Sequence, residues 1–422
     1  MKHKILIVLG GIFLVFLVVI YYEESSYNVL LDSNKTKIKN DRMLSLMLET
    51  EAKSGQYEMT TSSSWPTDGY VFNSELSKCE NGGILSWDEK SKKVLFEGNN
   101  IDKCYVYFDV YVPPTIADYC GSGDTLTTCF VNFAFLGSDK TLVYHHDSTL
   151  ENGAEDNSYR YAGSNEEVKN FVCFGSDAEN CPVDNLYRII GLVNGKLKLV
   201  KYDYATTDLL GTDGDYGTQY KINIVTYKGV LTNNDEFYWN NVTKTNTWSE
   251  SLLNKTNLNT NFINNIGNLW ADKIAMVTWK VGGNSYVNLS MQTAKVTYQN
   301  EIVNPVTTNT TDNLIEYTAK VGLIYISDYL YALSANYWSN PNASDIGNVN
   351  WMYMGLNEWT ITRRSDFSGL VMSINYRGYR DYDGYMTGST NGDLGVRPSF
   401  YLESSVTYVS GDGSINLPIR IN

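Results

Sequence analysis

Residues 186–202 read LYRIIGLVNGKLKLVKY and carry the clearest structural signal in the chain. Two runs rich in apolar and β-branched side chains flank Val193-Asn194-Gly195-Lys196. Asn-Gly between such runs is the strongest short-range sign of a tight β-hairpin, because both central residues of that turn need a positive φ. The stretch therefore predicts an antiparallel hairpin inside the C-terminal part of the chain.

The sequence downstream of this hairpin mixes helix and strand signals. Apolar residues recur at helical spacing in residues 246–266, which predicts a helix with one face in a core, although its many Asn residues weaken the pattern. Further strands are expected in runs bounded by turn residues, at 274–281, 319–326, 358–362, 369–376 and 396–402. The pattern predicts a region that mixes helices and strands, joined to what precedes it by the acidic stretch 150–163.

Residues 57–150 have a different pattern of short alternating runs, such as 104–112, separated by Gly, Asn and Pro signals. They predict a small β domain with Trp65 and Trp87 as core aromatics.

The chain contains an even number of cysteines, Cys79, Cys104, Cys120, Cys129, Cys173 and Cys181. Pairing of sequence neighbours gives three small loops, in which Cys79–Cys104 clamps one strand to the next, although six cysteines allow fifteen connectivities. Structural disulfides fit a location outside the cytoplasm.

The N-terminus predicts a membrane anchor at residues 1–24. MKHK precedes 18 uncharged residues, ILIVLGGIFLVFLVVIYY, and acids follow at Glu23 and Glu24. As a helix, this run is about 27 Å long, close to the hydrocarbon thickness of a bilayer. The basic start indicates a cytoplasmic N-terminus, hence a single-pass plasma-membrane protein with an extracellular C-terminal part. A cleaved signal peptide is the alternative, but small A-x-A residues are missing after the run. Residues 25–56 predict a stalk helix, or a helix packed on the next domain.

Several motifs after the hairpin appear in a recognisable order: TWKVGG at 278–283, KVGLIYISDYLYA at 320–332, EWTITR at 358–363 and GVRPSFYLESSVTYVSGDGS at 395–414. Residues 160–422 resemble an uncharacterised surface-protein domain of low-GC gut bacteria of the Firmicutes or Mollicutes type. Residues 78–108 resemble a companion module of the same proteins. The closing motif is similar to formylglycine-generating and C-type-lectin-like folds, which implies an irregular α+β architecture.

The same resemblance raises one enzymatic reaction, which the residues argue against. Formylglycine generation relies on cysteines in the C-terminal part of the fold, and no Cys follows Cys181. We therefore expect a protein that is not an enzyme and has no cofactor. A formal charge of -14 also argues against nucleic-acid partners.

Aromatic and arginine residues near the C-terminus are candidates for a binding surface, because Tyr, Trp and Arg are favoured in binding hot spots. The expected ligand residues are Tyr376, Arg377, Tyr379, Arg380, Tyr382 and Tyr385. We expect Trp351 and Trp359 to lie in the core instead.

Calcium is a weaker hypothesis. Asp381 and Asp383, like Asp213 and Asp215, place carboxylates two residues apart beside Gly, which suits a hard cation. Surface turns of this composition are also common without metal.

Taken together, the sequence predicts a membrane-anchored bacterial surface protein for non-catalytic ligand binding or adhesion, with a glycan or a host or envelope protein as ligand. A structural or envelope- or pilus-assembly component is the alternative, and a surface hydrolase is a third.

Overall fold

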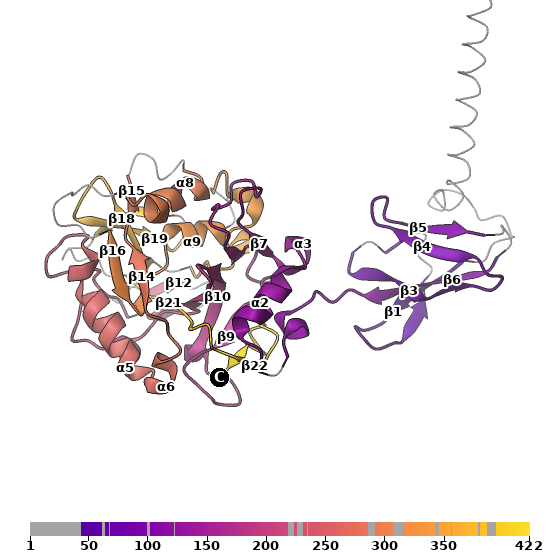
Figure 1. Ribbon diagram of the computed structural model, residues 1–422, viewed down its shortest axis with the longest axis horizontal. Coiled ribbons are helices and arrows are strands. Elements are labelled where there is room, and N and C mark those ends of the chain that lie inside the picture. The colour runs from indigo at the N-terminus through magenta and orange to yellow at the C-terminus, as the bar shows by residue number, and fades with distance from the viewer. Residues whose placement is uncertain are drawn as a thin grey trace, which may run out of the picture. The chain divides into compact units, whose positions relative to one another are not determined.

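The computed structural model describes residues 44–60, 64–66, 68–98, 102–121, 123–217, 223–225, 231–233, 235–285, 292–306, 315–341, 346–355, 357–378, 380–385 and 394–422 (Figure 1). The chain divides into two compact units, Met1–Pro113 and Pro114–Asn422. The predicted anchor at residues 1–24 lies outside the described residues. Within the described part, no helix is both long and apolar enough to cross a membrane.

The first unit is built from strands. One sheet has the order β2-β1-β6-β3, and the hairpin β4-β5 forms a second, two-stranded sheet. Phe108 is fully buried, with its ring 5.4 Å from that of Trp87 and 6.2 Å from that of Trp65, so both predicted aromatics join this core. The strands are β1 (Leu44–Glu49), β2 (Tyr57–Met59), β3 (Tyr70–Cys79), β4 (Ile84–Asp88), β5 (Lys93–Glu97) and β6 (Cys104–Val110).

The stalk-helix prediction is wrong for the residues that the structure describes. Residues 44–49 form β1, which pairs in parallel with β6 and antiparallel with β2. Leu44, Leu46 and Leu48 alternate along this strand and all three join the core. A period of two therefore overrides the approximate helical spacing of neighbouring apolar residues, because β6 offers backbone partners that an isolated stalk lacks.

The boundary between the units also differs from the prediction. Residues 114–150 belong to the second unit, not to the small β domain. Helix α2 (Leu126–Ala134) buries Phe130 and Phe133 there, and the ring of Phe130 lies 5.6 Å from that of Tyr161. The division falls at Pro113-Pro114, where two consecutive prolines disfavour continuation of a strand.

Three disulfides join sequence neighbours. The pairs are Cys79–Cys104, Cys120–Cys129 and Cys173–Cys181, which confirms the local pairing among the connectivities that the sequence leaves open. Cys79 and Cys104 lie directly opposite each other on β3 and β6.

The second unit has a mixed α+β fold that is rich in strands and has few, short helices. Its largest sheet has the order β17-β21-β11-β10-β8-β7, and β9 pairs with β10. The predicted hairpin is confirmed as β10 and β11, joined by Asn194 and Gly195 with φ of 51° and 73°. The strands are β7 (Val143–His145), β8 (Tyr159–Tyr161), β9 (Phe171–Cys173), β10 (Leu186–Val193), β11 (Lys196–Lys201), β17 (Val321–Gly322) and β21 (Ser399–Tyr401).

Smaller sheets complete the unit. A four-stranded sheet has the order β15-β18-β19-β20, and three further pairs are β14-β16, β12-β13 and β22-β23. Their strands are β12 (Asn223–Val225), β13 (Leu231–Asn233), β14 (Val277–Lys280), β15 (Gly283–Asn284), β16 (Glu316–Ala319), β18 (Glu358–Arg364), β19 (Leu370–Ile374), β20 (Arg380–Tyr385), β22 (Tyr408–Ser410) and β23 (Arg420–Ile421).

The helices of the second unit are short and lie around the sheets (Figure 1). The helix expected at 246–266 is found in part, as η3, η4 and α5, and the strand expected at 319–326 gives way to α9 at Ile326. The helical segments besides α2 are η1 (Ile116–Tyr119), α3 (Ser138–Thr141), η2 (Val183–Asn185), α4 (Thr207–Leu210), η3 (Trp248–Glu250), η4 (Leu253–Phe262), α5 (Ile263–Asn265), α6 (Asn268–Ala271), α8 (Ala294–Tyr298), η5 (Gln299–Val303), α9 (Ile326–Tyr331), η6 (Ala335–Tyr337) and α10 (Ile346–Val349).

The aromatic core of the first unit is testable by removing Phe108. Phe108→Ala leaves a cavity among the rings of Trp65, Phe72 and Trp87, so we expect the unfolding free energy of the first unit to fall by about 3–5 kcal/mol. Hydrogen exchange followed peptide by peptide checks this, with loss of protection confined to residues 44–113. The matched control, Phe400→Ala in the core of the second unit, should show the reverse pattern. Equal loss in both units for Phe108→Ala contradicts the division.

Candidate functional site

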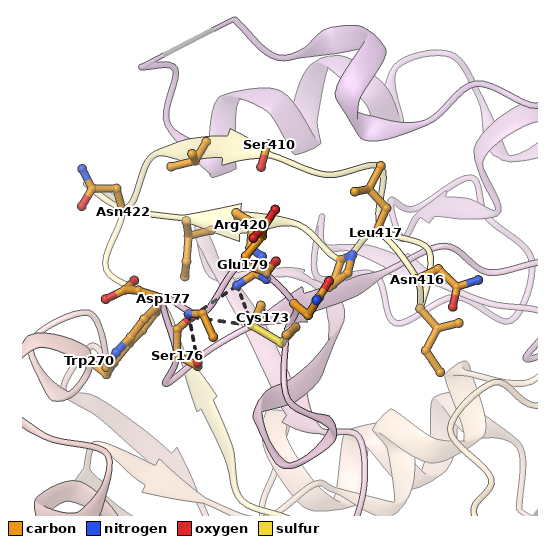
Figure 2. Close-up of a pocket in the computed structure, with 17 residues that line it drawn as sticks. Cys173, Ser176, Asp177, Glu179, Trp270, Ser410, Asn416, Leu417, Arg420 and Asn422 are labelled. Carbon is orange, nitrogen blue, oxygen red and sulfur yellow. Dashed lines mark hydrogen bonds between the residues drawn. A yellow bond between two sulfur atoms is a disulfide. The ribbon is translucent and has the colours of Figure 1, made fainter.

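A cleft of about 750 Å³ opens between the Cys173–Cys181 disulfide loop and the C-terminal hairpin of β22 and β23 (Figure 2). The loop supplies one wall, and residues 409–410, 415–418 and 420–422 supply the other. Trp270 from α6 also lines the cleft, but only 7% of it is exposed. Segments more than two hundred residues apart in sequence thus form one concave surface.

Arg420 fixes the loop wall of this cleft. Its guanidinium donates hydrogen bonds to the carbonyl oxygens of Glu179 at 2.6 Å and Ser176 at 3.4 Å, and contacts Cys173 Sγ at 3.1 Å. The strand that carries Arg420 follows Ile419, which exchanges backbone hydrogen bonds of 2.9 Å with β9. The hydrogen bonds from Arg420 to two carbonyls, together with the disulfide, therefore hold the loop in place, while the side chains of residues 177–180 face solvent.

The exposed groups of the cleft combine aliphatic and acidic character. Val409, Ile415 and Leu417 are exposed to 54%, 39% and 56%, and Asp177 and Glu179 are exposed on the opposite wall. Exposed aliphatic side chains clustered at a concavity are typical of interaction sites rather than of plain surface. Among the described residues, no three His, Cys, Asp or Glu side chains lie together in a way that could hold a metal ion.

The predicted aromatic and arginine surface is only partly described. Tyr376 is 45% exposed, and Arg377 donates from Nε to its hydroxyl at 2.9 Å and lies over its ring at 5.3 Å. Tyr379 lies outside the described residues. For the other candidates only the backbone is described, on β20, so the ligand and calcium hypotheses stay predictions for Arg380, Asp381, Tyr382, Asp383 and Tyr385.

The remaining sequence candidates have structural roles. Trp351 and Trp359 are each 1% exposed, which confirms them as core residues. Asp215 accepts hydrogen bonds from the backbone N–H groups of Asn241, Leu252 and Leu253 at 3.1 to 3.2 Å, and Asp213 accepts one from Asn261 at 2.6 Å. Both carboxylates thus serve as acceptors within the fold, with Asp215 at the start of η4.

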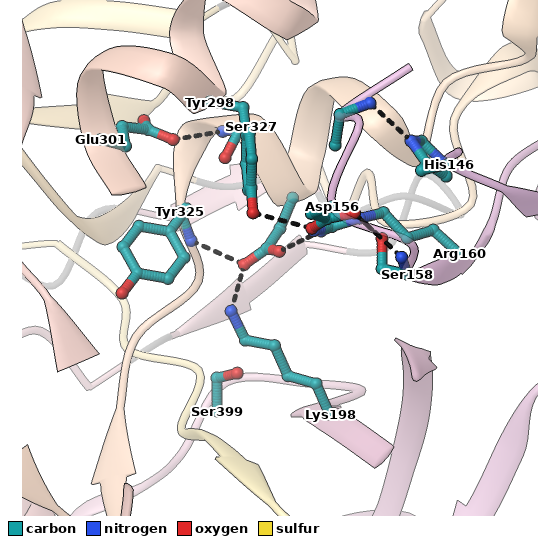
Figure 3. Close-up of polar contacts among 12 residues, drawn as sticks. His146, Asp156, Ser158, Arg160, Lys198, Tyr298, Glu301, Tyr325, Ser327 and Ser399 are labelled. Carbon is teal, nitrogen blue, oxygen red and sulfur yellow. Dashed lines mark hydrogen bonds and ion pairs between the residues drawn. The ribbon is translucent and has the colours of Figure 1, made fainter. Parts of the chain in front are cut away.

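The sequence analysis missed a buried cluster of charges that joins β8 and β11 of the large sheet to α9 (Figure 3). Arg160 on β8 pairs with Asp156 at 2.8 Å and with Asp328 of α9 at 3.2 Å, and Lys198 on β11 pairs with Asp328 at 2.5 Å. Tyr298 donates its hydroxyl to Asp156 at 2.7 Å. The side chains of Arg160, Lys198 and Asp328 are each only 1% exposed, so two cations are balanced by two carboxylates away from water.

Two further titratable groups border this cluster. Glu301 is fully buried and accepts hydrogen bonds from Thr362 Oγ1 at 2.6 Å and from Ser327 N–H at 3.1 Å, and burial raises its pKa to about 7. His146 accepts a hydrogen bond from Ala154 N–H at Nδ1, and burial followed by the charge of Arg160 lowers its pKa well below the usual value. Additional charge is thus disfavoured around the balanced cluster.

Arg363 is an exception among the buried arginines. Arg160, Arg188 and Arg397 all donate to acceptors, and Arg397 holds Glu358 through both carboxylate oxygens at 2.6 and 2.8 Å. Arg363 is 1% exposed, yet none of its three guanidinium nitrogens has a hydrogen-bond partner within the described residues. Burial lowers its pKa to about 10. As far as the described residues go, β18 therefore contains one paired buried charge, Glu358, and one without a partner, Arg363.

Comparison with known proteins identifies no relative of the chain. No family model, curated protein or solved structure matches it. The resemblance to bacterial surface proteins therefore stays a prediction, and function has to be derived from the cleft and the surrounding residues.

The buried carboxyl of Glu301 predicts a specific pH dependence. Its pKa is raised from 4.5 to about 7 in the folded state, so its contribution to stability is fully present below about pH 4.5 and is lost as the pH rises through about 7. Glu301→Gln removes this loss. Urea unfolding across this range should show the variant gaining about 3 kcal/mol relative to wild type from about pH 4 to about pH 8. Parallel pH profiles for the two proteins contradict the shift.

Arg363 and Arg397 give a matched pair of substitutions. Arg363→Met removes a buried charge that has no hydrogen-bond partner among the described residues, so we expect the unfolding free energy to rise by about 1–3 kcal/mol. Arg397→Met leaves Glu358 buried and unpaired, and should lower it by about 3–5 kcal/mol. Denaturant unfolding measures both free energies. If Arg363→Met lowers the unfolding free energy as much as Arg397→Met does, the prediction is wrong.

Proposed function

We propose that the protein is a membrane-anchored bacterial cell-surface protein whose second unit binds an extracellular ligand without catalysis. The sequence supports the location, since an uncharged run follows a basic start in residues 1–24. Three disulfides favour an oxidising compartment outside the cytoplasm. The orientation, with the N-terminus in the cytoplasm and the C-terminal part outside, belongs to this proposal.

The observation that carries the binding role is the cleft of about 750 Å³ beside the Cys173–Cys181 loop. Its loop wall is fixed before any ligand arrives, because Arg420 and the disulfide restrain that loop. A preformed wall loses little conformational entropy on binding. The large sheet supplies a rigid base and the loops supply the contacts, as in many binding proteins.

The residues of the cleft favour a protein ligand over a glycan. Val409, Ile415 and Leu417 are aliphatic, and the one aromatic lining residue, Trp270, is almost covered, so little flat ring surface is left for a sugar. Asp177 and Glu179 add carboxylates at the opposite wall. A host or envelope protein segment with aliphatic side chains and a basic group matches both features.

The finer assignment of the fold belongs to this proposal as well. An irregular strand-rich unit with short helices is compatible with the C-type-lectin-like similarity of its closing motif. Such scaffolds serve many functions, so the fold alone does not identify a ligand.

The proposal is tested with the full chain in detergent micelles on protein and glycan arrays. Leu417→Asp and Val409→Asp place charges on the aliphatic wall, so binding to the protein identified with wild type should weaken at least about tenfold. The matched control is Met276→Asp, since Met276 is equally exposed, at 57%, and does not line the cleft. It should bind as wild type does.

Three results contradict this proposal. If only glycans bind, and that binding depends on Leu417, the ligand of the cleft is a glycan and not a protein. If Leu417→Asp and Val409→Asp leave binding unchanged, the cleft is not the binding site. Blank arrays, together with cross-linking of the chain to envelope neighbours in cells, favour the structural alternative.

A further inference from the structure

The Cys173–Cys181 disulfide has an arginine in contact with one of its sulfur atoms (Figure 2). Arg420 Nη1 lies 3.1 Å from Cys173 Sγ. The same guanidinium donates to the carbonyl oxygens of Glu179 at 2.6 Å and Ser176 at 3.4 Å. Because backbone acceptors hold it there, the positive charge stays beside Cys173 whether or not the disulfide is closed.

The two cysteines of this disulfide differ in access. Both line the cleft, but Cys173 is only 1% exposed and ends β9, where its N–H donates to the carbonyl oxygen of Ile419 at 2.9 Å. Cys181 is half-buried and lies in the loop. An external thiolate attacks the sulfur that it can reach, and the other sulfur leaves. The geometry therefore favours attack at Cys181 and departure of Cys173.

The charge of Arg420 stabilises this departure. A thiolate leaves faster when its pKa is low, and a guanidinium in contact with the sulfur lowers that pKa. Asp177 and Glu179 act in the opposite sense from the same loop, but both are exposed, so water and salt screen them. The contact with Arg420 therefore outweighs the two carboxylates at Cys173 Sγ.

The surroundings of the other two disulfides give their sulfur atoms less help. Lys103, the neighbour of Cys104, pairs with Glu80 at 3.2 Å, so its charge is already balanced. Cys120 has an aspartate two residues before it and another four residues after it, which disfavour a thiolate. We therefore expect the three disulfides to react at different rates.

We propose that the Cys173–Cys181 disulfide is a thiol-exchange site, which an external dithiol reduces through Cys181. A thiolate of the dithiol attacks Cys181 Sγ and forms a new S–S bond. The Cys173–Cys181 bond breaks, and its electron pair passes to Cys173 Sγ beside Arg420. The second thiol of the dithiol, once deprotonated, attacks the first, and Cys181 leaves as a thiolate. The dithiol becomes a disulfide, two electrons pass to the protein, and water and the freed cysteines take up the two protons.

The exchange is reversible in this geometry. Arg420 keeps its hydrogen bonds to the carbonyl oxygens of Ser176 and Glu179 after reduction, so the loop stays near β9 and the two thiols stay close together. This inference does not depend on the ligand proposed for the cleft. It makes the loop wall of the cleft sensitive to thiols, because one of the two restraints on that wall is then lost.

Timed reduction of the full chain in detergent micelles tests the proposal. Neutral dithiothreitol is the probe, samples are quenched with iodoacetamide, and peptide mass spectrometry follows each cysteine. Cys173 and Cys181 should be alkylated at least about tenfold faster than the other four cysteines. With the neutral monothiol 2-mercaptoethanol, the mixed disulfide should form on Cys181. Equal rates for all three disulfides, or an adduct on Cys173, overturn the proposal.

A substitution separates the effect of the charge from that of loop restraint. Arg420→Met should slow the reduction of Cys173–Cys181 about tenfold, because the leaving thiolate loses its stabilising charge. An arginine that only holds the loop predicts the reverse, since a looser loop exposes the disulfide. The control, Lys196→Met, removes an exposed pair with Glu403 and should react as wild type does.

Two outcomes with the variant overturn the role of Arg420. These are an unchanged rate and a faster rate in Arg420→Met, each measured on the folded fraction from gel filtration. If Arg420→Met does not fold, Arg420→Lys, which keeps the positive charge, should retain a faster rate at Cys173–Cys181 than at the other disulfides. The position of the adduct in the wild-type chain decides the direction of attack in either case.

Discussion

The second unit depends on the pairing of charges that its folding removes from water. Arg160 contacts Asp156 in the preceding loop and Asp328 in α9, and Lys198 brings β11 to the same carboxylate. Removal of one member leaves a buried charge uncompensated, which is far more costly than the loss of an exposed ion pair. The large sheet and α9 are therefore fixed to each other by electrostatics as well as by apolar packing.

This constraint explains how irregular loops can coexist with a defined cleft. The longest continuous helical run in the described part of the chain spans residues 253–265 and is formed by η4 and α5. An isolated helix of that length is only marginally stable, so tertiary contacts must hold the unit together. The C-terminal hairpin follows the same logic, because Arg420 satisfies carbonyls of the disulfide loop that have no strand partner. The cleft thus forms where backbone groups find hydrogen-bond partners: Arg420 binds carbonyl oxygens of the loop wall, and Ile419 exchanges hydrogen bonds with β9.

The features that the sequence predicts correctly depend on local rules. The Asn194-Gly195 turn follows from backbone sterics, and the disulfides join successive pairs of cysteines along the chain. The stalk prediction fails because β1 finds its partner β6 some sixty residues away. Lys198 and Asp328 look like surface residues in sequence, since nothing local indicates that they meet. The cleft residues are hidden for the same reason, because their two walls come from distant segments.

The guanidinium of Arg363, which has no hydrogen-bond partner in the part of the chain that the structure describes, stands against this pattern of charge balance. Its neighbour on β18, Glu358, is held by Arg397 through two hydrogen bonds, so the strand can accommodate a compensated charge. Natural sequences rarely keep an uncompensated buried charge where an apolar side chain of similar volume fits, unless selection acts on something other than stability. Within the described residues, Arg160, Arg188 and Arg397 all have hydrogen-bond acceptors and Arg363 has none. Arg363 therefore differs from the arginines whose hydrogen bonds hold the fold together.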